Sequence, residues 1–111
     1  MRKGKDIYIS FLLDFYSPML TEKQHEALDL YYNEDLSLSE ISEQWGITRQ
    51  GVREIIKRGE QILTGLEEKL GLAGRFRSLE ALCDRLEGLD VPDEGTKEEI
   101  CGIAEQIRNI I

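Results

Sequence analysis

The stretch LSEISEQWGITRQGVREI, residues 38–55, decides the fold of this chain. Ser37 stands just before it and a glutamate follows three positions later, which is the capping-box signature of a helix start. Gly46 tolerates the left-handed backbone conformation of a tight turn, so the helix is expected to end at Trp45. Thr48 is expected to cap the next helix. The stretch therefore predicts two helices joined by a very short turn.

Apolar residues stand where two such helices would touch each other. They are Ile41, Trp45, Ile47, Val52 and Ile55. Ser42, which follows the first of them, is small enough for the two helices to approach closely. Two helices that meet at a steep angle through a short turn containing glycine form a helix-turn-helix. We therefore predict a helix-turn-helix at the centre of the chain.

The rest of the chain repeats the helical pattern. Apolar residues recur every three or four positions and only Pro18 and Pro92 interrupt them, which predicts an all-α protein. Gly59 and Gly65 lie inside the expected fourth helix, where each costs about 1 kcal/mol relative to alanine, so packing is expected to offset that loss. The expected helices cover residues 5–16, 22–32, 38–45, 48–70 and 76–89, followed by a last helix that Thr96 and Glu99 cap.

Two glycines suggest how the chain is divided. Gly71 and Gly74 follow the long fourth helix and mark a boundary. We expect residues 1–74 to hold the N-terminal helices and the helix-turn-helix core. Residues 75–111 are expected to form a helical extension, which either joins the same domain or forms an interface with a second copy or a partner.

Composition limits the function. The chain has 111 residues, 41% hydrophobic content, a net charge of −8 and a pI near 4.7. Such an acidic protein does not hold nucleic acid with its whole surface, so any contact must come from a local basic patch. No apolar run reaches the roughly 18–20 residues of a membrane span. Asp6 and Asp14 interrupt the apolar start, which argues against a signal peptide and favours a cytoplasmic protein.

The second helix of the helix-turn-helix carries such a patch. Arg49, Arg53 and Lys57 are spaced by four and form one stripe, and residues 49–58 contain four basic residues and one acidic residue. Arginine pairs well with guanine and glutamine with adenine, while lysine suits phosphate. The alternative is an ordinary solvated face in which Glu54 pairs with a basic residue four positions on. The candidate nucleic-acid contacts are Thr48, Arg49, Gln50, Arg53, Lys57 and Arg58. Arg2, Lys3 and Lys5 form a basic N-terminal arm, for which we favour an ordinary solvated end over a nucleic-acid contact.

Catalytic and metal-binding constellations are not predicted. His25 has no nucleophile beside it in the pattern, and no glycine-rich phosphate loop precedes a helix. Cys83 and Cys101 form no metal-like spacing and are expected to be reduced thiols. The sequence therefore predicts a protein without enzymatic activity, cofactor or metal.

The first expected helix is apolar on nearly all sides, because only Asp6, Ser10 and Asp14 form a polar stripe. Such a helix must be buried on more than one face, which predicts contact with a second subunit or with another protein, and we expect a homodimer. The apolar end Ile110–Ile111 supports the same prediction. One functional hypothesis follows, in which the helix-turn-helix is only structural and the function of the protein is dimerisation.

With these residues described, a family resemblance is apparent. The stretch from Thr21 to Leu66 resembles the fourth region of sigma factors, a helix-turn-helix that reads promoters. Together with LLDFYSPMLTEKQ (12–24) and KRGEQILTGLEEKLGL (57–72), it is similar to the YlxM-like family of small bacterial helix-turn-helix proteins. The resemblance implies a sigma-like helix-turn-helix with an N-terminal helix and two C-terminal helices. Gly51 departs from the alanine expected there.

The resemblance also implies a function. It points to a cytoplasmic accessory protein of the signal recognition particle pathway, with DNA, RNA or components of the particle as partners. The alternative is a DNA-binding transcriptional regulator that uses the sigma-like recognition helix. By the same resemblance Arg49, Gln50 and Arg53 would read bases, and Ser37, Lys57 and Arg58 would contact phosphates.

Overall fold

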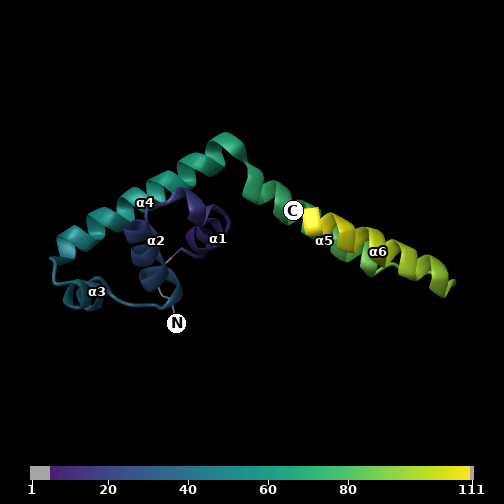
Figure 1. Cartoon of the computed structure of the whole chain (residues 1–111), viewed down its shortest axis with the longest axis horizontal. Helices are drawn as coiled ribbons and strands as arrows, with labels where there is room; N and C mark the ends of the chain where they lie inside the picture. Colours follow the sequence, from purple (N-terminus) through teal and green to yellow (C-terminus); the bar gives the residue numbers. More distant parts are fainter. Residues whose placement is uncertain (1–5, 111) are drawn as a thin grey trace. The chain divides into compact units, whose positions relative to one another are not determined.

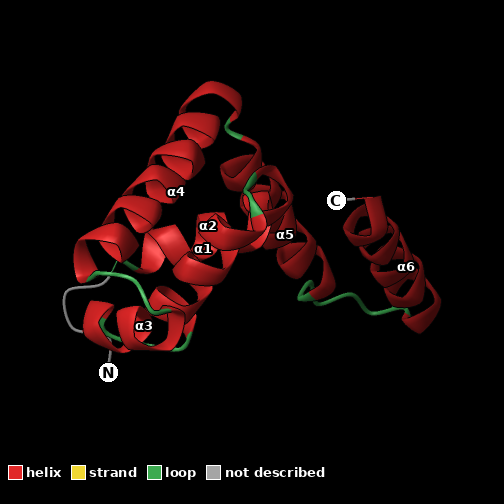
Figure 2. Cartoon of the chain, turned by 60° about the vertical axis from the view of Figure 1, so that its left-hand side comes forward, coloured by secondary structure: helices red, strands yellow, loops and turns green. Residues whose placement is uncertain are grey.

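The computed structural model describes residues 6–110, and within them the fold is all-α, as predicted. Figures 1 and 2 show helices joined by short loops, and no strand is formed in the described part. The chain divides into two compact units, Met1–Leu70 and Gly71–Ile111. The helices are α1 (Ile7–Tyr16), α2 (Glu22–Leu28), α3 (Leu38–Trp45), α4 (Arg49–Leu70), α5 (Leu72–Glu87) and α6 (Glu94–Ile110).

Local signals set both ends of α1. Asp6 caps the helix, because its carboxylate accepts a hydrogen bond of 2.8 Å from the backbone N–H of Tyr8. The helix thus begins at Ile7, and the expected start at Lys5 lies outside the described residues, as does the basic arm. After α1 the chain makes a short 3₁₀ turn, Ser17–Met19, around its proline. This turn ends α1 at the position that the proline predicts.

The second helix begins as predicted but ends differently. Thr21 and Gln24 form a reciprocal capping box with two hydrogen bonds of 3.1 Å. The α-helix then stops at Leu28, and residues Asp29–Asn33 continue as one wider π turn, where the sequence predicted regular helix. The wider turn coincides with the burial of Tyr32, which donates a hydrogen bond from its hydroxyl group to Glu60 of α4.

The core of the first unit lies between α4 and the helices packed on it. A second tyrosine also reaches α4, because the Tyr16 hydroxyl donates to Glu67 Oε1 at 2.5 Å. These two phenol–carboxylate hydrogen bonds attach α1 and the π turn to one side of the long helix. The largest fully buried side chains of this core are Leu12, Leu13, Leu28, Ile41, Val52 and Leu63.

Gly59 allows α2 to lie close to α4. A Cβ atom added there would lie 2.7 Å from Leu28 Cδ1 and 3.3 Å from Leu28 Cγ. Leu28 is fully buried, so it has little room to move away. A Cβ atom added at Gly65, in the same helix, meets nothing within 4 Å. Packing thus explains one of the two helix-weakening glycines and does not explain the other.

The apolar surface of α1 is covered in part by its own unit. Its large apolar residues Ile9, Leu12 and Leu13 are buried against α4 and the π turn of the same unit. Its exposed apolar residues lie in the first turn, with Ile7 at 75% and Tyr8 at 47%, and Phe11 and Phe15 are half-buried. One apolar face of α1 is therefore covered by its own unit, and contact with a second subunit or another protein stays a prediction.

The second unit is a hairpin of α5 and α6. Gly71 has a left-handed φ of 62° and separates α4 from α5, whereas Gly74 lies inside α5. The cap expected at Thr96 and Glu99 is wrong. Asp93 caps α6 instead, because its carboxylate accepts hydrogen bonds from the Gly95 N–H at 3.2 Å and the Thr96 hydroxyl at 2.8 Å. The division into domains at residue 74 stays a prediction.

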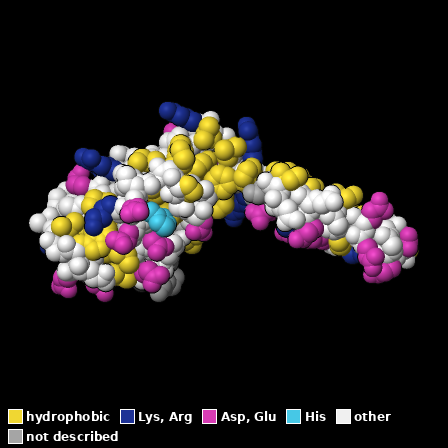
Figure 3. Space-filling view, in the orientation of Figure 1, with side chains coloured by type: hydrophobic (Ala, Val, Ile, Leu, Met, Phe, Trp, Pro, Cys, Tyr) yellow, Lys and Arg dark blue, Asp and Glu magenta, His cyan; other side chains and the backbone are white. Residues whose placement is uncertain are grey.

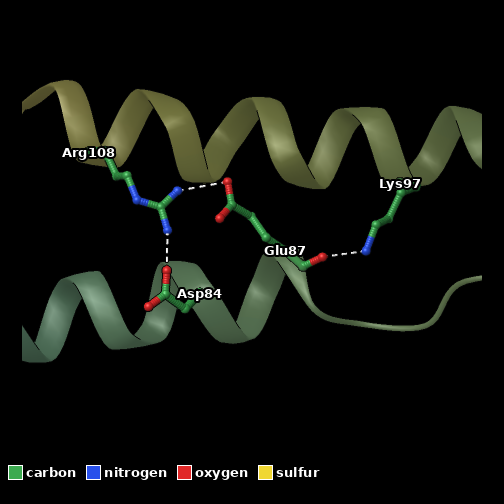
Figure 4. Close-up of polar contacts among 4 residues, drawn as sticks. All are labelled: Asp84, Glu87, Lys97 and Arg108. Carbon is green, nitrogen blue, oxygen red and sulfur yellow. Dashed lines mark hydrogen bonds and ion pairs between the residues drawn. The ribbon is translucent and has the colours of Figure 1, made fainter.

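Polar contacts fix the register of this hairpin (Figure 4). Arg108 of α6 lies 2.5 Å from an oxygen of Asp84 and 2.7 Å from an oxygen of Glu87, both on α5. Lys97 donates to the backbone carbonyls of Glu87 and, at 2.8 Å, of Leu89. The hydrogen bond from Arg108 lowers the pKa of Glu87 below its ordinary value. No helix in the described part is long and apolar enough to cross a membrane.

Candidate nucleic-acid interface

The turn between α3 and α4 has the predicted structure. Ser37 and Glu40 form a capping box, with hydrogen bonds of 2.9 and 3.1 Å, at the start of α3. Gly46 closes the helix with a left-handed φ of 66°, and the N–H of Ile47 bonds to the Ser42 carbonyl at 3.2 Å. Ser42 is buried, as expected of a small residue between two helices. The central unit is thus a helix-turn-helix.

Three of its five predicted apolar contacts are weaker than expected, and one of them, Ile55, is half-buried. Ile47 is 41% exposed, because the tight turn directs it outward instead of between the helices. Trp45 is only half-buried, and the ammonium group of Lys23 lies 4.2 Å from the centre of its ring. Ile41 and Val52, by contrast, are fully buried and form the contact between α3 and α4. The inner pair therefore carries the packing, while the residues at the turn lie at its edge.

The N-terminus of α4 is unusual in its charge. Thr48 caps it, because its hydroxyl oxygen accepts a 3.0 Å hydrogen bond from the N–H of Gly51. The first turn holds no acidic residue, and Arg49 occupies it instead. Free backbone N–H groups and the helix dipole make such an end positive, and a carboxylate there is normally stabilising. An arginine at this end leaves the positive charge unbalanced, which suits an anion such as phosphate.

The structure brings most of the candidate residues into one hollow. Its volume is about 610 Å³, and it lies between the N-termini of α3 and α4. Ser37 thereby lies beside residues that follow it by more than ten positions. All seven candidate contacts of the sequence are exposed. The hollow is lined by Ser37, Leu38, Ser39, Thr48, Arg49, Gln50 and Arg53.

A second hollow of about 400 Å³ continues along α4 and shares Leu38 and Arg53 with the first. Lys57 lines it together with Tyr31, so the stripe of three cations borders a continuous depression. Arg58 lines neither hollow, and it follows Lys57 by one position on the helix, which places it on a neighbouring face. The sequence prediction missed Ser39 and Tyr31. Ser39 could have been found from its place in the first turn of a capped helix. No pattern in the sequence, however, connects Tyr31 with the basic stripe.

No carboxylate of the described residues neutralises the cations of the stripe. Within residues 6–110, Arg49, Arg53, Lys57 and Arg58 form no ion pair. The alternative pairing of Glu54 with Arg58 is not formed. Glu54 instead accepts a 3.0 Å hydrogen bond from the Gln50 amide group. The basic side chains can therefore approach an external anion without first losing a partner. Gln50, by contrast, would have to break its hydrogen bond with Glu54 before it could bond to a nucleobase.

Comparison with known proteins agrees with this geometry. The sequence model of the UPF0122 family, described as "Putative helix-turn-helix protein, YlxM / p13 like", matches residues 3–103. The chain belongs to the UPF0122 family. The resemblance to YlxM-like proteins is thereby confirmed, and the family description names a helix-turn-helix and no enzymatic activity.

Relatives from several bacteria share most of the chain. A UPF0122 protein of Desulforamulus reducens is 48% identical over 86 residues, which cover 74% of this chain and 74% of the relative. UPF0122 proteins of Acetivibrio thermocellus and Bacillus cereus are 42% and 39% identical, and the matches cover 92% and 96% of both chains. The similarity therefore extends through the hairpin as well as the helix-turn-helix.

Proposed function

We propose that this UPF0122 member is a non-enzymatic regulatory protein that binds nucleic acid through the hollow between α3 and α4. The observation that carries the proposal is the composition of this hollow. Two helix N-termini, two arginines and a glutamine meet there, and neither arginine is neutralised by a carboxylate of the described residues. In helix-turn-helix proteins the start of the second helix is the part that enters the major groove.

In this binding mode Arg49, Gln50 and Arg53 contact base edges. Ser37, Lys57 and Arg58 contact phosphates on either side, with Arg58 at the margin, and Thr48 orients the start of the helix. Three or four phosphate contacts give a log–log salt slope of about −3. The net charge of −8 weakens long-range attraction further, so we expect modest affinity that depends steeply on salt.

For the biological setting, the family resemblance favours an accessory role in the signal recognition particle pathway. The RNA of the particle and its GTPase are then the first partners to test, and a cytoplasmic location belongs to the same proposal. The second candidate is a DNA-binding transcriptional regulator. The exposed start of α4 favours it, because the major groove of B-form DNA admits a helix and that of A-form RNA does not.

Fluorescence anisotropy with the full-length chain separates these functions. The probes are the RNA of the particle, a pool of short duplex DNA and the purified GTPase, each at low salt. Preferred binding of the RNA or the GTPase supports the accessory role, and sequence-dependent binding of duplex DNA supports the regulator. No binding of either nucleic acid at micromolar protein and low salt would refute the proposed nucleic-acid interface.

A matched pair of variants tests the site itself. Arg49→Ala/Arg53→Ala removes two cations from the hollow, and Lys69→Ala/Arg75→Ala removes two exposed cations elsewhere. The first variant should lose about 30-fold or more in affinity, since each good contact is worth about 1–3 kcal/mol. The second should stay close to wild type. Equal losses in both variants would mean that net charge alone drives binding and that the hollow is not the site.

A further inference from the structure

The hairpin of α5 and α6 leaves an apolar side uncovered. Inside the hairpin the fully buried side chains are small, namely Ala73, Cys83 and Ala104. Figure 3 shows hydrophobic side chains along one edge of this hairpin. Five of its larger apolar residues expose between 37% and 84% of their surface, namely Leu79, Leu82, Leu89, Ile103 and Ile110.

Three of them, Leu79, Leu82 and Leu89, border a groove with a volume of about 440 Å³. Both helices contribute to it, since Leu82 and Leu86 come from α5 and Ile107 from α6. Arg85 is the only charged residue that lines this groove, so the groove does not resemble a site for a polar ligand. Its apolar walls instead match the surface that a packed helix would cover.

The spacing of these residues indicates what kind of surface covers them. Both helices repeat large aliphatic residues in steps of three and four, which is the pattern of a and d positions in coiled coils and four-helix bundles. In such bundles each helix contacts two neighbours, whereas a hairpin offers it only one. The repeats are Leu79, Leu82, Leu86 and Leu89 in and just after α5, and Ile100, Ile103, Ile107 and Ile110 in α6.

The hairpin is also too small to bury its own apolar residues. Chains below about 40 residues usually need disulfides, metals or oligomerisation to fold stably. The ion pairs of Arg108 and the hydrogen bonds of Lys97 fix the register of the two helices, and so preform the apolar face. What the unit lacks is a second apolar layer.

We propose that this face of the α5–α6 hairpin is the interface through which two copies of the chain form a dimer. Two hairpins face each other across a twofold axis and complete a four-helix bundle. A second copy fits because a twofold interface places the same patch on both sides, and this patch supplies both leucine and isoleucine repeats. Complete burial of the exposed parts of these five residues would remove about 500 Å² per copy, or about 1,000 Å² in total, which is the minimum area of a biological interface.

The proposed dimer interface does not depend on nucleic-acid binding, but dimerisation would change the number of basic stripes that can bind nucleic acid. One copy carries a single short stripe from Arg49 to Lys57, whereas a dimer presents two such stripes and can engage two half-sites. Of the two dimer surfaces that the sequence suggested, α1 and residues 75–111, this interface lies on the second.

Sedimentation velocity of the full-length chain at micromolar concentrations tests the proposal. The wild type should sediment as a dimer of 12.8 kDa subunits. Leu82→Glu/Ile103→Glu should shift it to monomer, whereas Ala81→Glu/Gln106→Glu, which places the same charges at exposed positions of the same helices, should leave the dimer intact. A wild-type monomer overturns the proposal, as does a dimer that survives Leu82→Glu/Ile103→Glu unchanged.

Two further measurements keep the result independent of folding. Leu82→Ala/Ile103→Ala retains helix-forming residues and should raise the dimer dissociation constant about tenfold or more. Trp45 is the one tryptophan of the chain and lies in the first unit, so its fluorescence reports whether that unit stays folded. Ile7→Glu on α1 should leave the dimer unchanged, and dissociation by this variant would place the interface on α1 and overturn the proposal.

Discussion

Gly59 and Gly65 offer a stringent test of the packing in the first unit. Both lie in α4, and alanine at either position raises intrinsic helix stability by about 1 kcal/mol. At Gly59 the new Cβ would lie 2.7 Å from Leu28 Cδ1, well inside the optimal carbon–carbon distance of about 3.5–4.0 Å. At Gly65 the new Cβ meets nothing within 4 Å. The two substitutions therefore differ only in the contact with Leu28.

The magnitude follows from these terms. Forcing extra volume into a packed core costs about 1–3 kcal/mol, because side chains must leave their preferred rotamers. Gly59→Ala should thus change the free energy of unfolding by between about 0 and −2 kcal/mol, while Gly65→Ala should raise it by about 1 kcal/mol. The difference between the two variants is about 1–3 kcal/mol, and it does not depend on the helix propensity that they share.

Urea denaturation followed by Trp45 fluorescence measures this difference, because Trp45 and both glycines lie in the first compact unit of the chain. A double-mutant cycle with Leu28→Ala then isolates the contact, since removing the leucine side chain should make Gly59→Ala stabilising. If Gly59→Ala and Gly65→Ala stabilise the protein equally in the wild-type background, α2 does not lie as close to α4 as the structure has it, and the reasoning fails.

Three further predictions concern hydrogen bonds and caps. Burial and the bond to Glu60 raise the pKa of Tyr32 above its ordinary value of 10.0, so the unfolded chain releases this proton first and wild-type stability should fall as the pH rises above about 10. Tyr32→Phe should reduce that fall and cost about 1 kcal/mol at neutral pH, whereas Tyr8→Phe at an exposed position should do neither. Asp93→Ala should increase amide hydrogen exchange in the first turn of α6, while Glu99→Ala should not. Faster exchange in Glu99→Ala than in Asp93→Ala would support the cap predicted from the sequence. Arg108→Gln should lower the helix content of the hairpin measured by circular dichroism, and an unchanged spectrum and thermal midpoint would show that the ion pairs with α5 contribute no stability.

Features that depend on neighbours three or four residues apart could be predicted from the sequence. The capping boxes at Thr21 and Ser37 and the left-handed Gly46 fix the ends of helices through hydrogen bonds within one turn. The same signature failed at Thr96, because Asp93 caps the helix three residues earlier and the Thr96 hydroxyl donates to the Asp93 carboxylate inside its first turn. A local pattern therefore predicts a cap only when no stronger cap precedes it.

The candidate site was predicted in part for the same reason. The stripe of Arg49, Arg53 and Lys57 follows from helical spacing alone, so its residues could be named before their positions were known. Whether Glu54 neutralises the stripe could not be predicted, since Gln50 and Arg58 are both four positions away from it and only the structure shows which one bonds. Tyr31 enters the site through the π turn, which no pattern indicated.

The sequence by itself determined the all-α class, the helix-turn-helix and the basic stripe, because each depends on interactions along one helix or across one tight turn. Only the tertiary structure decided which apolar surfaces are covered. It buries one face of α1 within its own unit and leaves the large apolar residues of α5 and α6 exposed, although both regions are strongly apolar in sequence. It also distinguishes Gly59 from Gly65. The physical reason is that burial depends on which helix packs against a given face, and that partner lies far away in the chain.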